Sequence, residues 1–129
     1  MKLFGSILIV FIFIVGVFYP NAIYAQQQNK YLPFAEVMPQ PKGGLAAIYK
    51  HITYPQIARE TGIQGKEYLL IYIDEKGNVD DVKVLKGLGA GCDEAAINGV
   101  KDVKFTPGEN NGKPVKVKLS LAITFKLQQ

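Results

Sequence analysis

The sequence predicts an α+β fold in which a three-stranded sheet, antiparallel or mixed, carries helices packed on one face. Between Pro114 and Leu127, large apolar residues occupy every second position, as in a strand with one face on a core and the other in water. Two earlier runs, Gly65–Asp74 and Val79–Lys86, flank a short glycine-containing turn, which is typical of a hairpin. Segments with helical spacing precede the hairpin and separate it from the last strand.

The chain begins with the features of an export signal. One basic residue, Lys2, precedes an unbroken apolar run at residues 3–19, and a segment containing Pro20 follows and ends at Ala25. These are the parts of a secretory signal peptide, so we expect residues 1–25 to be cleaved. The alternative is an uncleaved membrane anchor, because the run approaches the ~17–25 residues that a spanning helix needs.

A linker or arm is expected at residues 26–42, which contain three prolines and no apolar period, ahead of a domain at residues 43–129. Two short helices should follow. The first is indicated by apolar residues at helical spacing, which are Leu45, Ile48, Tyr49 and Ile52. The second should begin at Pro55 and turn Ile57 and Ala58 toward the core.

The strand at Gly65–Asp74 is apolar on both faces, so we expect it at the centre of the sheet. A helix from about Asp93 to Val103 should follow the hairpin. Pro114–Leu127 is then left as an edge strand, whose lysines guard it against indiscriminate pairing. Because it exceeds the usual ~3–10 residues of a strand, we expect part of it to outrun its partner and offer free backbone to another chain.

Composition excludes several classes of function. The formal net charge is +4, and no two basic residues are adjacent, which argues against a nucleic-acid partner. His51 is the only histidine and Cys92 the only cysteine, so a multi-histidine metal cluster and an intramolecular disulfide are excluded. We interpret Cys92 as a small buried hydrophobe, with a thiol of lowered pKa at a helix start as the alternative.

Two further motifs have structural interpretations. Asp80 and Asp81 point to opposite sides of a strand unless a bulge intervenes, so they indicate a solvated surface. The glycines of Gly87–Gly91 resemble a phosphate-binding loop, but their spacing departs from the dinucleotide fingerprint and no parallel βαβ unit is expected. The sequence therefore predicts no cofactor, no metal and no enzymatic activity.

Six spaced motifs resemble one family when taken in order. They are Tyr54–Arg59, Gly62–Gly65, Asp74–Leu85, Cys92–Ala96, Phe105–Gly108 and Asn111–Val115. Over about residues 45–127 the chain resembles the TonB C-terminal domain. The resemblance implies an energy transducer of the Gram-negative envelope, whose C-terminal domain captures the Ton box of outer-membrane transporters for iron chelates, cobalamin and similar nutrients as an added strand.

Carried over by position, the resemblance implies a partner-binding edge and a bordering segment ahead of Tyr-Pro. These residues are His51, Ile52, Thr53, Tyr54, Val115, Lys116, Val117, Lys118, Leu119, Ser120, Leu121, Ala122, Ile123, Thr124 and Phe125. The implied location is the periplasm, or the inner membrane facing the periplasm if the leader stays.

The chain departs from the family's transducers in two places. Residues 3–19 lack the functional histidine of their membrane helix, and the arm at residues 26–42 spans at most roughly 60 Å, too short to cross the periplasm. An inner-membrane proton-channel complex is therefore an expected partner only if the leader is uncleaved. The alternative function is an envelope assembly protein that forms a homodimer through the same edge. The sequence names neither the transporter nor its cargo.

Overall fold

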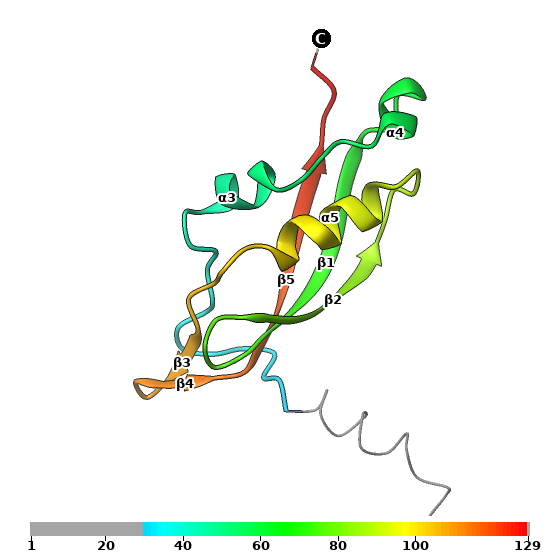
Figure 1. Ribbon diagram of the computed structural model, residues 1–129. Helices are drawn as coiled ribbons and strands as arrows, with labels where there is room; N and C mark the ends of the chain where they lie inside the picture. The colour runs from blue at the N-terminus through cyan, green and yellow to red at the C-terminus, as the bar shows by residue number, and fades with distance from the viewer. Residues whose placement is uncertain (1–29, 129) are drawn as a thin grey trace, which may run out of the picture. The chain divides into compact units, whose positions relative to one another are not determined.

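A computed structural model describes residues 30–128 (Figure 1). The expected signal peptide and its anchor alternative lie outside the described residues. Within the described part, no helix is long and apolar enough to cross a membrane.

The described part holds three helices and five strands (Figure 1). In chain order they are α3 (Leu45–Lys50), α4 (Gln56–Glu60), β1 (Gly65–Ile73), β2 (Val79–Lys86), α5 (Cys92–Lys101), β3 (Gly108–Asn110), β4 (Lys113–Val115) and β5 (Val117–Phe125). The main sheet has the order β2-β1-β5, with both pairings antiparallel, and β3 and β4 form a separate small hairpin. The predicted α+β fold is confirmed, and the sheet is wholly antiparallel.

Strand β1 is the central strand, as its two apolar faces predicted. Ile71 pairs with Val82 of β2 on one side and with Leu119 of β5 on the other. Leu69, Ile71 and Ile73 are fully buried against the helices, and Tyr72 on the opposite face is only 6% exposed.

The core lies between the sheet and α5, with α3 and α4 closing its margin (Figure 1). The helices contribute Ile48, Ala58, Ala96 and Val100, all fully buried. The prediction that Ile57 turns inward is wrong, because α4 is little more than one turn and presents only its Ala58 side to the core; Ile57 is 65% exposed. The helix expected from about Asp93 to Val103 runs instead from Cys92 to Lys101, so Val103 is buried beyond its end.

The prediction of one continuous last strand is also wrong. The chain breaks at Lys116, so Val115 ends β4 and pairs with Gly108 of β3. Strand β5 pairs with β1 along its whole length, from Val117 to Phe125, so it does not outrun its partner. The free backbone is therefore the lateral edge of β5 and not an overhanging end.

Two side-chain interpretations are resolved by the packing. Cys92 is fully buried at the start of α5, and burial raises the pKa of its thiol, so the alternative of a lowered pKa is wrong. Tyr72 and Ile73 of β1 lie opposite Asp81 and Val79 of β2. Asp80, between the two paired residues of β2, is therefore the extra residue of a β-bulge. Both carboxylates are exposed, in keeping with a solvated surface.

Candidate functional site

The outer edge of β5 faces no further strand of the main sheet. The N–H of Lys118 donates outward to the carbonyl of Leu32 at 3.0 Å. Because backbone groups alternate along a strand, the even-numbered residues of β5 turn their N–H and C=O away from β1, whereas the odd-numbered residues pair with it. Ser120 and Ala122 therefore turn outward, and their N–H groups find no hydrogen-bond partner among residues 30–128.

One end of this edge is occupied by the chain's own N-terminal strap, which we define as Tyr31 and Leu32. Leu32 forms a parallel bridge to Val117. Its N–H donates to the carbonyl of Lys116 at 2.8 Å, and its carbonyl accepts the Lys118 N–H. The segment expected as an arm continues past β3 and Phe105, and from Tyr31 onward it belongs to the same compact unit as the sheet.

The other end of the edge is occupied by a side chain of α3. The N–H of Thr124 donates to the hydroxyl of Tyr49 at 3.0 Å, which independently confirms that even-numbered residues turn outward. Tyr49 and Leu45 remain 39% and 48% exposed on this helix. The predicted apolar stripe of α3 thus buries only Ile48 completely, while Tyr49 reaches across to β5.

Apolar surface accompanies the free backbone. Leu119 and Leu121 pack against the core but are only partly buried, whereas their partners on β1, Ile71 and Leu69, are fully buried. The difference arises because no strand lies beyond β5 to cover the two leucines. A side chain on an added strand would find apolar contact there.

The residues His51–Tyr54, which are expected to border the bound peptide, differ in their contacts. Tyr54 lies edge-on to Phe125 at the end of β5, with ring centroids 5.5 Å apart, and its hydroxyl donates to the carbonyl of Ile63. Ile52 packs instead against α5, and His51 and Thr53 are exposed. Of the four expected residues, Tyr54 contacts β5 through the ring of Phe125.

The strap and Tyr49 were missed by sequence reasoning. Leu32 lies in a proline-containing segment that resembles a linker, and its contact with Val117 joins distant parts of the chain. Tyr49 belongs to the apolar stripe whose spacing indicates the first helix. Its hydroxyl was the one available signal that this position could reach a polar partner.

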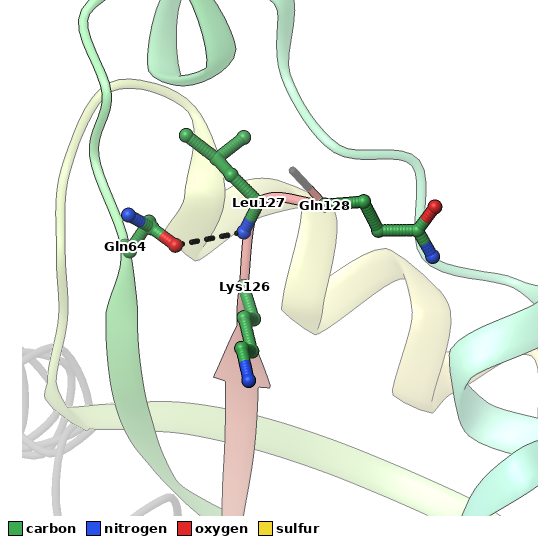
Figure 2. Close-up of a pocket in the computed structure, with 4 residues that line it drawn as sticks. All are labelled: Gln64, Lys126, Leu127 and Gln128. Atoms are coloured by element: carbon green, nitrogen blue, oxygen red, sulfur yellow. Dashed lines mark hydrogen bonds between the residues drawn. The ribbon is translucent and has the colours of Figure 1, made fainter.

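A shallow pocket of ≈ 630 Å³ lies beyond the end of β5 (Figure 2). It is lined by Gln64, Lys126, Leu127 and Gln128, and the Leu127 N–H donates to the Gln64 side chain at 2.9 Å. These residues form no nucleophile–base pair. Among residues 30–128, no three His, Cys, Asp or Glu side chains are placed to hold a metal ion.

Comparison with known proteins supports this arrangement at the level of family. Residues 50–127 match the family described as the Gram-negative bacterial TonB protein C-terminal, and the chain therefore belongs to that family. It is similar to the Protein TonB of Vibrio cholerae serotype O1, with 36% identity over 76 residues, covering 58% of this chain and 31% of that protein. It is also similar to the Protein TonB of Xanthomonas campestris pv. campestris, with 31% identity over 75 residues, covering 57% of this chain and 34% of that protein.

Two solved structures share the fold. The solution NMR structure of the Pseudomonas aeruginosa TonB CTD matches with a TM-score of 0.51 and 26% identity, over 60% of this chain and 80% of that one. The NMR structure of the Helicobacter pylori TonB-CTD matches with a TM-score of 0.50 and 27% identity, over 65% of this chain and 89% of that one. The chain spans about a third of the length of the curated relatives it matches, and the shared part is the C-terminal domain.

Proposed function

We propose that this protein is a TonB-like docking module that captures the Ton box of an outer-membrane transporter along the outer edge of β5. The carrying observation is the pair of free outward-facing backbone residues, Ser120 and Ala122, on an edge strand. Binding would serve energy-coupled uptake of nutrients such as iron chelates or cobalamin. The protein acts by binding and carries out no chemistry of its own.

The physical basis is β-augmentation. An extended peptide gains affinity from main-chain hydrogen bonds to the edge and selectivity from contacts of its alternate side chains. The edge offers both, since Leu119 and Leu121 present partly exposed apolar surface beside the free backbone.

The direct test is an NMR titration with synthetic Ton-box peptides from the organism's own transporters. The expected result is a set of amide shifts centred on Ser120 and Ala122 and spreading to Leu119 and Leu121. An absence of shifts at millimolar peptide would show that the fold serves a different partner.

Proline substitutions distinguish an effect on peptide pairing at the edge from an effect on the fold. Ser120→Pro removes an N–H that points to solvent, so the sheet should stay intact while peptide binding weakens by about tenfold or more. Leu121→Pro instead removes an N–H directed at Leu69 of β1 and should disrupt the sheet itself. Ser120→Ala is the matched control and should bind normally. Equal peptide affinity in a folded Ser120→Pro variant would refute pairing at this edge.

A second candidate function is self-association through the same edge, in an envelope assembly role without coupling to transport. The unpaired backbone beside partly exposed leucines favours it, since such edges pair readily with identical edges. Sedimentation over a range of concentrations decides: a concentration-dependent dimer that Ser120→Pro abolishes supports it, and a strict monomer excludes it.

We further propose that the chain is exported to the periplasm of a Gram-negative bacterium, with residues 1–25 removed, residues 26–42 forming an arm that packs on the domain from Tyr31 onward, and residues 43–129 forming the docking domain. N-terminal sequencing of the protein recovered from its host tests this. A chain beginning at Gln26 is expected. An intact leader would indicate an inner-membrane subunit, for which a proton-channel complex becomes the partner to test.

A further inference from the structure

The N-terminal strap is anchored by more than the two hydrogen bonds of Leu32. The ring of Tyr31 lies edge-on to Tyr72, with centroids 5.1 Å apart, on the sheet face opposite the helices. Its hydroxyl donates to the carboxylate of Asp80, the extra residue of the β2 bulge, and the ammonium of Lys116 lies 5.5 Å from the ring centroid. The strap therefore occupies a defined position on the sheet.

The strap pairs with β5 over only a short stretch. After Leu32 the chain leaves the edge at Pro33; Phe34 is 74% exposed and the next residue, Ala35, is buried. If the strap continued as a parallel strand beyond Leu32, the next N–H of β5 that it would bond is that of Ser120. No residue of the strap's own segment bonds this N–H. The free edge begins where the strap turns away.

We propose that Leu32 and Tyr49 are specificity-determining residues that set the length and register of the partner strand. This inference rests on the proposed function. Leu32 occupies the outward carbonyl of Lys116 and N–H of Lys118, and Tyr49 occupies the outward N–H of Thr124. The remaining open window is residues 118–122, from the carbonyl of Lys118 to that of Ala122, which fits an extended segment of about five residues.

Longer partners gain little from extra residues while both ends are occupied. The strap is part of the same chain, so it competes for its end of the edge at a high effective concentration, and a free peptide must displace it. At the other end the Tyr49 hydroxyl satisfies the Thr124 N–H, so pairing there would require one hydrogen bond to replace another. The two occupied ends should therefore limit the length of the paired segment, so that residues of a longer peptide outside the window add little affinity.

The test compares two Ton-box peptides, a core of about five residues and a version extended to about nine, on the full chain. The unmodified protein should bind both within about twofold. Leu32→Pro deletes the N–H that bonds the Lys116 carbonyl and so loosens the strap, which keeps only the carbonyl that accepts the Lys118 N–H. Combined with Tyr49→Phe, which keeps the ring but removes the hydroxyl, it weakens the occupation of both ends. The double variant should bind the longer peptide about tenfold more tightly than the shorter, from the added backbone hydrogen bonds.

Phe34→Ala is the matched control, because Phe34 belongs to the same segment but is 74% exposed and away from the edge. It should retain the equal affinities of the unmodified protein. An unmodified protein that already prefers the longer peptide tenfold, or a folded double variant that binds the core peptide without gaining length preference, would overturn the inference.

Hydrogen exchange separates this inference from the proposed function. The amides of Lys118 and Thr124 should exchange slowly in the unmodified protein. Leu32→Pro loosens the strap by deleting its bond to the Lys116 carbonyl, so the Lys118 amide, which bonds the Leu32 carbonyl, should exchange faster while Thr124 is unchanged. Tyr49→Phe should accelerate exchange at Thr124 alone. If no peptide binds any variant, the proposed function fails. In that case, equal exchange rates at Lys118 and Thr124 in all variants would also overturn the inference that Leu32 and Tyr49 occupy the two ends of the edge. The expected pattern of exchange would instead support this inference for any other strand that pairs with β5.

Discussion

Glu67 and Asp93 accept the same backbone N–H group, that of Leu88, with each oxygen 3.1 Å from the nitrogen. Glu67 is fully buried on the helix-facing side of β1, and its second oxygen finds no hydrogen-bond partner among residues 30–128. Burial, then the neighbouring Asp93 side chain, raises the pKa of Glu67 to about 7. The Glu67 side chain in turn lowers the pKa of Asp93. The pair thus holds one proton, on Glu67, up to near-neutral pH.

A pH-dependent stability follows from Glu67. Its pKa rises on folding from an ordinary value of 4.5 to about 7, so the folded state binds more protons between these limits. The free energy of unfolding should therefore be highest near pH 5 and fall by up to about 3 kcal/mol as the pH rises through 7. Denaturant unfolding at pH 5, 6, 7 and 8 measures this slope.

Glu67→Gln removes the titrating group while its amide oxygen still accepts from Leu88 and its amide nitrogen can donate to Asp93. The variant should lose most of the slope between pH 5 and 8 and be more stable than the unmodified protein at pH 8. Glu75→Gln, an exposed carboxylate in the hairpin turn, is the control and should keep the slope. A Glu67→Gln variant whose slope matches the control would show that another group titrates.

Cys92 should be chemically inert in the folded protein. It is fully buried, and burial, reinforced by Glu67 and Asp93, raises the pKa of its thiol, so little thiolate exists at neutral pH. Labelling with a thiol reagent should be at least about a hundredfold slower than for Ala46→Cys, an exposed position, in a Cys92→Ala background. Rapid labelling of the native thiol would contradict the burial and reopen a role in chemistry.

The sequence predicted the features that depend on local period and failed where distant segments meet. The apolar faces of β1 identified the central strand, and alternation identified β5 as an edge, because both depend only on which side chains need burial. The break at Lys116 was invisible, since Val115 and Val117 alternate correctly although one belongs to the β3–β4 hairpin and the other to the main sheet.

The occupied ends of the candidate edge were unpredictable for the same reason. Leu32 meets Val117, and Tyr49 meets Thr124, across most of the domain's sequence, and no local pattern encodes either contact. Glu67 was equally hidden: a charged residue at an inward position of a strand is apparent only once the register is known. The sequence therefore identified the edge strand of the sheet, whereas the length of its open backbone depended on the tertiary structure.

Tyr54 should stabilise the domain through its hydroxyl as well as its ring. The hydroxyl donates to the carbonyl of Ile63, just beyond α4, while the ring packs edge-on against Phe125. Tyr54→Phe keeps the ring contact and should cost about 1 kcal/mol in the free energy of unfolding. Tyr68→Phe, whose ring is 40% exposed on the open sheet face, is the control and should change stability by less than about 0.5 kcal/mol. Equal effects in both variants would show that the Tyr54 hydroxyl contributes nothing net.

Gly77 should be far less replaceable than Gly112, although both turn residues have positive φ, at 84° and 75°. A Cβ at Gly77 would lie 1.9 Å from the carbonyl oxygen of Phe105, whose N–H bonds the Gly77 carbonyl at 2.9 Å; a Cβ at Gly112 would meet nothing within 4 Å. Gly112→Ala should therefore cost only the backbone strain of about 1–2 kcal/mol. Gly77→Ala should cost more than about 3 kcal/mol, because the hairpin turn must separate from buried Phe105. Chemical denaturation of both variants measures the difference, and equal losses would mean that the turn moves away from Phe105 without penalty.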